Sequence, residues 1–205
     1  MPRAIVCEDS LIKGDVTISS GCVVHPSAQI ISESGPIIIG ENCIIEEYAK
    51  IIHRIPKDHK LYSENPDKLP VLVIGANNIF EVGCTVEALK IGEKNIFECK
   101  SYVSPDVKIS SNCVIGAGCH LTGEHNLLEN TVIYGNRCQQ REALDKQGVC
   151  LQNILKPKKT LILLIIYFQS HMLQLDFLRK ILPNYHHLRK ATFDPKKISA
   201  ASRAQ

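Results

Sequence analysis

A six-residue repeat of apolar residues runs through most of this chain and constrains its fold more than any other feature. Every sixth position is apolar from Val6 to Ile51, apart from one step of nine residues. The same holds from Ile74 to Ile133, apart from one step of five residues. Apolar residues make up only 44% of the chain, so composition alone does not produce an unbroken series of this length. The nineteen positions are Val6, Ile12, Ile18, Val24, Ile30, Ile39, Ile45, Ile51, Ile74, Phe80, Val86, Ile91, Phe97, Val103, Ile109, Ile115, Leu121, Leu127 and Ile133.

A period of six is typical of a coil of short strands. It fits neither an α-helix, which repeats every 3.6 residues, nor a long strand, which alternates with a period of two. If each hexad forms one strand and one bend, three hexads close a triangular turn, and the next turn stacks about 4.8 Å further along. The repeat therefore predicts an all-β solenoid of six to seven triangular coils over residues 1–140.

The position four residues after each repeated apolar residue is usually small or β-branched, which predicts that both side chains share a narrow interior. Five cysteines fall on this position, where a free cysteine acts as a small buried apolar residue. Because the chain has no Cys-x-x-Cys pair, we favour packing over zinc binding for these cysteines. The small positions are Ser10, Val16, Cys22, Ala28, Ser34, Cys43, Ala49, Cys84, Ser101, Val107, Cys113, Cys119 and Thr131.

Asparagine and glycine recur where the bends should lie. Both tolerate the left-handed backbone region, and an asparagine side chain can bond its own turn. We therefore expect these residues to shape the bends: Asn42, Asn77, Asn78, Asn95, Gly14, Gly40, Gly75, Gly92 and Gly116.

The rest of the chain departs from the repeat. Residues 53–70 hold three prolines and seven charged residues, which predicts a projecting loop that either carries a binding site or is a tolerated surface insertion. Residues 141–171 form an atypical linker, and their run Leu161–Phe168 is shorter than the roughly 20 residues that cross a bilayer. Residues 172–190 form an amphipathic helix by their spacing of Leu173, Phe177, Ile181, Tyr185 and Leu188. We expect this helix to pack on the coils and to be kinked or divided at Pro183. Residues 191–205 form a basic, disordered tail.

Composition and cysteine content indicate a reducing, cytoplasmic compartment. The chain has nine cysteines, an odd number, and an N-terminus that meets acidic residues before any apolar run. The net charge of +3 is too small to argue for a nucleic-acid partner.

Two enzymatic uses of hexapeptide coils can be weighed from the histidines. A gamma-class carbonic anhydrase, which Lys13-Gly14-Asp15-Val16 weakly resembles, needs three convergent histidines. His53 could supply one, but residues 74–84 contain none. A CoA-dependent acyltransferase needs one histidine as a general base.

The acyltransferase candidates are His25, His120 and His125, and none has a carboxylate spaced to orient it along the sequence. His186 and His187 are more typical of a surface pair than of a metal site. We therefore expect no catalytic, cofactor-binding or metal-binding residue and no cofactor. The exposed coil ends of a rigid prism suit stacking against another protein.

Several phrases of the sequence resemble the dynactin subunit 6 family. They are KGDVTI, HPSAQIISESGPIIIGENCIIEEYAKII, NNIFEVGC, CVIGAGC, ENTVIYGNRC and LQLDFLRKILPNYHHLRK, within residues 6–138 and 173–190. The resemblance implies a left-handed parallel β-helix with a C-terminal α-helix and no catalytic activity. It also implies a place at the pointed end of dynactin with dynactin subunit 5, the actin-related pointed-end subunit and the large zinc-containing pointed-end subunit, in the cytoplasm and on the cytoskeleton.

One segment, Gly148 to Met172, has no counterpart in that family. It opens at Gly148-Val149, where a GT splice donor could lie, and closes in Ile-Ile-Tyr-Phe-Gln, as a pyrimidine tract followed by CAG would encode. One hypothesis is therefore a translated retained intron. The alternative is a genuine extra strand and linker.

Overall fold

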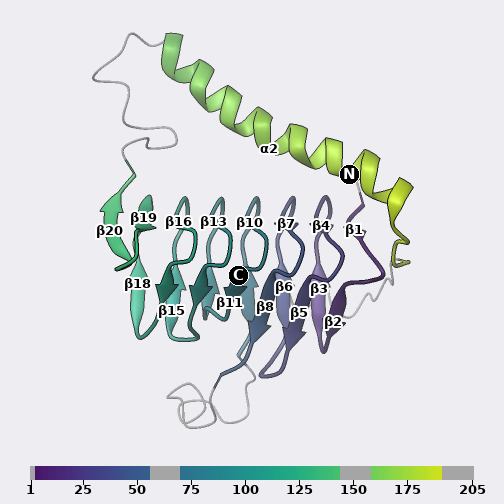
Figure 1. Cartoon of the computed structure of the whole chain (residues 1–205), viewed down its shortest axis with the longest axis horizontal. Helices are drawn as coiled ribbons and strands as arrows, with labels where there is room; N and C mark the ends of the chain where they lie inside the picture. The colour runs from purple at the N-terminus through teal and green to yellow at the C-terminus, as the bar shows by residue number, and fades with distance from the viewer. Residues whose placement is uncertain (1–2, 56–69, 144–157, 191–205) are drawn as a thin grey trace.

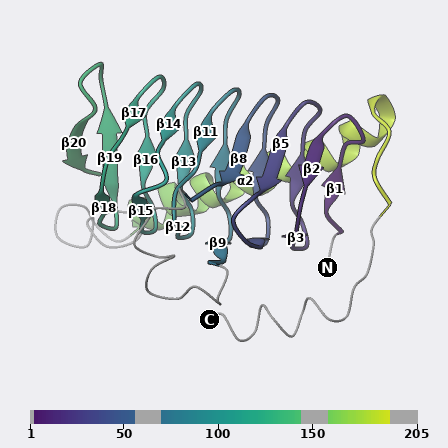
Figure 2. The same cartoon turned by 90° about the horizontal axis from the view of Figure 1, so that it is seen from below.

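The computed structural model describes residues 3–55, 70–143 and 158–190, with side chains in the last range from His171 onward. In these residues the chain forms a parallel β-solenoid of about six coils. Figures 1 and 2 show the coils stacked in one row, with a single long helix, α2 (Lys158–Tyr185), along one side. The predicted all-β solenoid with a C-terminal helix is confirmed.

Each coil contributes one strand to each of three sheets. Sheet 1 contains β1 (Ile5–Val6), β4 (Val23–Val24), β7 (Ile44–Ile45), β10 (Ile79–Phe80), β13 (Ile96–Phe97), β16 (Val114–Ile115), β19 (Thr131–Tyr134) and β20 (Gln139–Glu142). Sheet 2 contains β2 (Leu11–Lys13), β5 (Gln29–Ser32), β8 (Lys50–His53), β11 (Thr85–Val86), β14 (Tyr102–Val103) and β17 (His120–Leu121). Sheet 3 contains β3 (Val16–Ile18), β6 (Ile37–Ile39), β9 (Leu72–Ile74), β12 (Lys90–Ile91), β15 (Val107–Ile109) and β18 (His125–Leu127).

The hexad sets the register of all three sheets. Each repeated apolar residue pairs with the one three hexads later, as in Phe97↔Ile115 and Ile115↔Ile133. The nine-residue and five-residue steps fall at bends, so the strands on either side remain aligned, as in Phe80↔Phe97. Strand pairing therefore tolerates length changes only between the strands.

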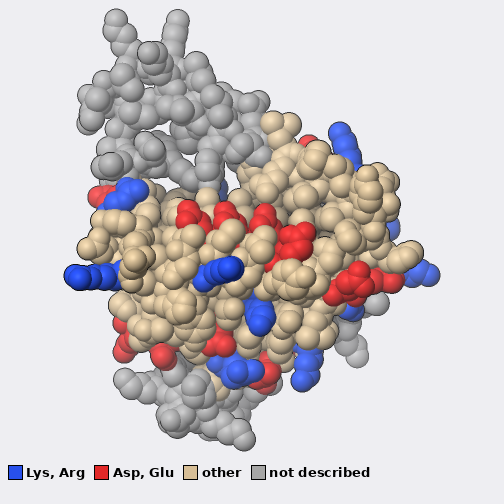
Figure 3. Space-filling view, viewed as in Figure 1, with Lys and Arg blue, Asp and Glu red and all other residues tan. Residues whose placement is uncertain are grey.

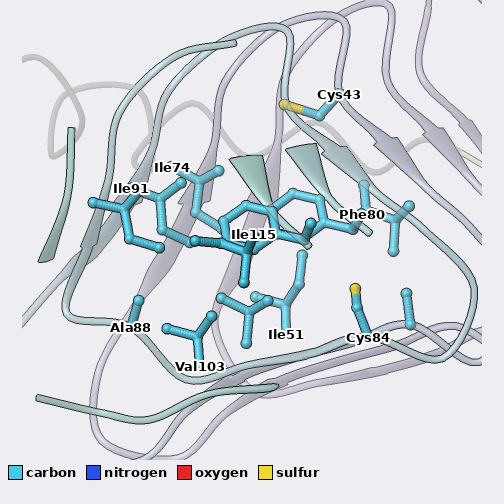
Figure 4. Close-up of a cluster of buried hydrophobic side chains, with 14 of the residues drawn as sticks. Cys43, Ile51, Ile74, Phe80, Cys84, Ala88, Ile91, Val103 and Ile115 are labelled. Carbon is cyan, nitrogen blue, oxygen red and sulfur yellow. The ribbon is translucent and has the colours of Figure 1, made fainter. Parts of the chain in front are cut away.

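The repeated apolar side chains fill the interior of the solenoid (Figure 4), where Phe80 and Phe97 stack with ring centroids 4.7 Å apart. Sixteen of the nineteen are buried, and the three in the first coil are half-buried because only one coil packs against them. Of the thirteen small positions all are buried except Val16, which is half-buried. The narrow interior predicted from the sequence is confirmed.

The glycines at the bends divide into two kinds. Gly14 has a positive φ of 83°, as expected. Gly40, Gly75, Gly92 and Gly116 do not, and the expectation of a left-handed backbone is wrong for them. The first three stack at one corner of successive coils, where a Cβ on Gly75 would lie 2.6 Å from the Gly92 carbonyl oxygen. Glycine is required there because the coils approach too closely for a side chain.

The asparagines divide in the same way. Asn42 and Asn77 have φ of 55° and 59°, so they shape bends as expected. Asn78 and Asn95 instead point inward and are fully buried. The Asn78 Oδ1 accepts a hydrogen bond from the Asn95 main-chain N–H at 2.8 Å, and the Asn95 Oδ1 accepts one from the Cys113 N–H at 2.7 Å.

The helix α2 differs from the expectation at both ends. It begins at Lys158, within residues 141–171 that we expected to be a linker, and it ends at Tyr185 before residue 190. Residues 158–171 contain neither proline nor glycine, so nothing in them interrupts a helix. Pro183 lies inside the helix without dividing it.

The helix packs on the coils, as expected, but through a different face. Of the five residues that we took as its apolar face, Leu173, Phe177 and Tyr185 are 67%, 60% and 77% exposed, whereas Ile181 and Leu188 are half-buried. Leu175 and Leu182 are buried instead, against the outer surface of sheet 1. The helix carries two apolar stripes, and spacing alone does not show which one the sheet covers.

Candidate interaction surfaces

The structure orients one candidate base, His25, with a carboxylate. Its Nδ1 lies 2.8 Å from the Glu47 Oε1, so the expectation that no carboxylate orients it is wrong. Burial raises the pKa of Glu47, but the hydrogen bonds from His25 and from the main chain together outweigh burial and lower the pKa below its usual value. The Nε2 of His25 is buried, so no acceptor hydroxyl can reach the nitrogen that a general base would use.

His53, the candidate zinc ligand, has a structural role. It is 1% exposed, and its Nε2 donates to the Pro70 carbonyl oxygen at 2.9 Å. Burial lowers its pKa, which favours the neutral ring. This hydrogen bond ties together the two ends of the segment 53–70, whose residues 56–69 lie outside the described part of the chain.

The remaining histidines are separate from one another. His120 is exposed and lies against Tyr102, with ring centroids 5.8 Å apart, and the His125 Nε2 lies 3.1 Å from the Thr122 carbonyl oxygen. His186 is half-buried and His187 exposed at the end of α2. Among the described residues, no three His, Cys, Asp or Glu side chains converge as metal ligands do.

The inward cysteines behave as packing residues. Cys22, Cys43, Cys84, Cys113 and Cys119 are all free thiols and 0–2% exposed. Burial raises the pKa of Cys84 far above its ordinary value and also raises that of Cys113. These two thiols stay protonated, and a protonated thiol is a poor nucleophile and a poor metal ligand. At Cys22 the hydrogen bond with the Cys43 thiol lowers the pKa instead, so the packing role of Cys22 rests on its complete burial.

Both edges of sheet 1 are covered by antiparallel segments. At the last coil, β20 pairs with β19. At the first coil, Leu188 forms a bridge with Cys7, and the Arg189 N–H donates to the Val6 carbonyl oxygen at 2.8 Å. The Arg189 guanidinium also bonds the Ser10 carbonyl oxygen, so the chain after α2 is fastened to the first coil.

Sheets 2 and 3 end differently. In the described part of the chain no strand pairs with the outer edge of β2 or β3 at the first coil, or with that of β17 or β18 at the last. Large apolar side chains lie beside these edges, because Leu11 is 49% and Leu128 is 72% exposed. Unpaired strand edges are natural sites for pairing with another chain.

The side of the solenoid shown in Figure 3 carries acidic side chains in a row beneath α2, with basic side chains more scattered. This distribution gives that side a negative strip along the stack of coils. It favours a partner with a basic complementary surface.

Three animal proteins called dynactin subunit 6 are similar to this chain. The protein of Danio rerio is 43% identical over 187 residues, which cover 91% of this chain and 85% of the relative. That of Xenopus tropicalis is 44% identical over 191 residues, which cover 93% and 84%. That of Nematostella vectensis is 43% identical over 189 residues, which cover 92% and 90%. No family model matches the chain.

Among solved structures, a hexapeptide transferase family protein from Anaplasma phagocytophilum has a similar fold. Its TM-score is 0.58 at 16% identity, and the match covers 87% of this chain and 93% of that one. At this identity the likeness shows the fold alone. Among the described residues, no helix has the length and apolar character that crossing a membrane requires.

Proposed function

The chain belongs to the dynactin subunit 6 family, and on this basis we propose that it is a non-catalytic structural subunit of the dynactin pointed-end complex. The observation that carries this proposal is an identity of 43–44% over more than nine-tenths of the chain. In this role it pairs with dynactin subunit 5. Together with the actin-related and the large zinc-containing pointed-end subunits it caps the filament, in the cytoplasm and on the cytoskeleton.

The geometry of the solenoid supports such a role. Its interior is filled with side chains, and its ends leave strand edges of sheets 2 and 3 unpaired. A second solenoid whose strands continue those sheets would extend the main-chain pairing and cover Leu11 or Leu128. The buried Nε2 of His25 argues against that histidine as the base of an acyl transfer, the enzymatic alternative for this fold.

Affinity purification tests the proposal directly. The tagged full chain, expressed in animal cells, should recover dynactin subunit 5 and the other pointed-end subunits in near-equal amounts. Acetyl-CoA turnover and carbon dioxide hydration by the purified complex should stay at the rate of buffer. Recovery of no dynactin subunit, or turnover above buffer, would contradict the proposal.

Three variants locate the contact. Leu11→Asp places a charge on the free edge of β2 and Leu128→Asp one at the last coil, while Leu173→Asp is the matched control on the outer face of α2. If subunit 5 stacks on a coil end, one of the first two variants should lose it and the control should keep it. Replacing residues 54–69 with a short linker, which leaves His53 and Pro70 in place, tests whether that segment contributes.

A further inference from the structure

The end of the solenoid at β17 and β19 brings two cysteines together. Cys119 is the inward residue just before β17 and is 2% exposed. Cys138 is half-buried and is the last residue of the turn between β19 and β20 (Figure 2). The Cys119 thiol and the Cys138 main-chain N–H donate to one acceptor, the Gly135 carbonyl oxygen, at 3.5 and 3.0 Å. Both cysteines are therefore held around the same turn.

The two thiols also contact each other. Burial, the charge of the Cys138 sulfur and a hydrogen bond between the two thiols together raise the pKa of Cys119. The Cys138 side chain packs against the apolar core to which Cys119 belongs. A disulfide forms without strain only where two sulfur atoms can meet with little movement of the backbone. Thiols that already share a hydrogen bond satisfy this condition.

The Cys138 sulfur lies on the outer edge of β17. The His120 main-chain N–H donates to the Cys138 Sγ at 3.2 Å, and the Cys138 thiol donates to the His120 carbonyl oxygen at 3.3 Å. Tyr102, which pairs with His120 one coil earlier, uses its N–H to bond the next strand at the Cys119 carbonyl oxygen. The Cys138 side chain therefore occupies the place that an added strand would take at His120.

We propose that Cys119 and Cys138 are a site of oxidation that forms a disulfide on reaction with hydrogen peroxide. Cys138 reacts first, because its half-buried sulfur is the one that a small oxidant can reach. Its thiolate attacks one peroxide oxygen, so that an S–O bond forms, the O–O bond breaks, and hydroxide leaves and is protonated to water.

The second step joins the two sulfur atoms. The Cys119 sulfur attacks the sulfur of the Cys138 sulfenic acid, so that the S–S bond forms and the S–O bond breaks. The oxygen leaves as water with the proton of the Cys119 thiol. Two thiols and one peroxide therefore give one disulfide and two waters.

The disulfide fastens the turn before β20 to the end of β17. In the reduced protein this turn can move aside and release the His120 N–H and carbonyl oxygen to a partner's strand. In the oxidised protein the turn is held across them. Oxidation therefore closes one of the strand edges that the last coil offers for pairing with another chain.

The chain contains two internal controls. Cys22 and Cys43 also share a hydrogen bond between thiols, but both are 0% exposed, so peroxide cannot reach them. Cys99 is exposed, but its thiol donates to a carboxylate at 3.2 Å instead of meeting a second thiol. Contact between thiols and access from solvent thus coincide at the proposed pair and at neither control.

Peptide mass mapping tests the proposal. The full chain is treated with hydrogen peroxide, its remaining thiols are blocked with N-ethylmaleimide, and it is digested with trypsin without reductant. The peptides with Cys119 and Cys138 should be joined, in about tenfold higher yield than the Cys22–Cys43 link, and dithiothreitol should separate them. Fragmentation of the joined peptide distinguishes Cys119 from Cys113, which trypsin leaves in the same peptide.

Three results of this mapping would overturn the proposal. The first is oxidation of Cys99 with no link between Cys119 and Cys138. The second is an equal yield for the Cys22–Cys43 link, which would mean that access does not select the pair. The third is a link that forms only between two chains.

The variant Cys119→Ser tests the order of the two steps. Serine fits this position, because Ser101 occupies it one coil earlier and is 1% exposed. In the variant the Cys138 sulfenic acid has no partner, so dimedone should label Cys138 about tenfold more than in the unchanged chain. Equal labelling of the two proteins would show that Cys119 does not consume the sulfenic acid and would overturn the proposal.

Amide hydrogen exchange tests the closure of the edge. After oxidation β20 should exchange about tenfold more slowly in the unchanged chain and at an unaltered rate in Cys119→Ser. No change in the unchanged chain would overturn the closure of the β17 edge. None of these measurements depends on binding to dynactin.

Discussion

Asn78 and Asn95 occupy the same corner of successive coils, are equally buried, and differ in how many hydrogen bonds they make. The Asn78 Nδ2 donates to the Gly75 and Gly92 carbonyl oxygens at 2.7 and 2.9 Å, and its Oδ1 accepts from the Asn95 N–H at 2.8 Å. The Asn95 Oδ1 accepts from the Cys113 N–H at 2.7 Å, and its buried Nδ2 has no partner. Comparing the two residues therefore isolates the effect of hydrogen-bond number on stability at equal burial.

Replacing either residue with alanine removes the same volume but a different number of bonds. Asn78→Ala removes three hydrogen bonds to main-chain groups, which at about 1 kcal/mol each costs about 3 kcal/mol of unfolding free energy. Asn95→Ala removes one such hydrogen bond and costs about 1 kcal/mol. With a urea dependence of about 2 kcal/mol per molar, the midpoints should differ by about 1 M.

Urea unfolding followed by far-UV circular dichroism measures this difference. In both variants the dependence of the unfolding free energy on urea concentration should equal that of the unchanged chain. A solenoid can unfold coil by coil, so a changed dependence would report lost cooperativity. Equal midpoints for Asn78→Ala and Asn95→Ala would refute the reasoning. They would show that bond number at this corner does not set stability.

Three further predictions rest on single features. Lys90 and Lys108 are directly paired in sheet 3, so Lys108→Glu should stabilise the fold by about 0.5 kcal/mol in urea unfolding, and a loss of stability would contradict this. At pH 8, maleimide should label the exposed Cys99 and spare Cys84, as peptide mass mapping would show; rapid labelling of Cys84 would mean that the coils open. Burial lowers the pKa of His171 from 6.5, so stability present above pH 6.5 is lost as the pH falls through the folded pKa. His171→Gln should therefore lose less stability than the unchanged chain between pH 7 and 5.5, and an equal loss would exclude this cause.

The interior of the solenoid could be predicted from the sequence because its determinants are local. A hexad places one side chain inward wherever it occurs, so Ile115 and Cys119 could be assigned without knowing their neighbours. The nine-residue and five-residue steps could be recognised for the same reason, since a bend can change length without changing the phase of the strands that follow.

Interactions between coils could not be predicted in this way. His25 meets Glu47 across one coil, 22 residues away, and Asn78 meets the Asn95 N–H 17 residues away. Neither separation along the sequence is a recognisable motif, because the number of residues between contacting positions depends on where the irregular steps of the repeat fall. The face of α2 was also open, since Leu173 and Leu175 lie on two stripes of similar apolarity and only the sheet distinguishes them.

Phe97, Ile115 and Ile133 stack in register, so the length of the solenoid is set by its number of coils. Each added triplet of hexads would lengthen it by one increment of about 4.8 Å and no other amount, since the three walls must advance together. The distance between the two ends of the solenoid is therefore a whole number of such increments. In any assembly that binds both ends, the number of hexads in the sequence sets the distance between the two binding partners.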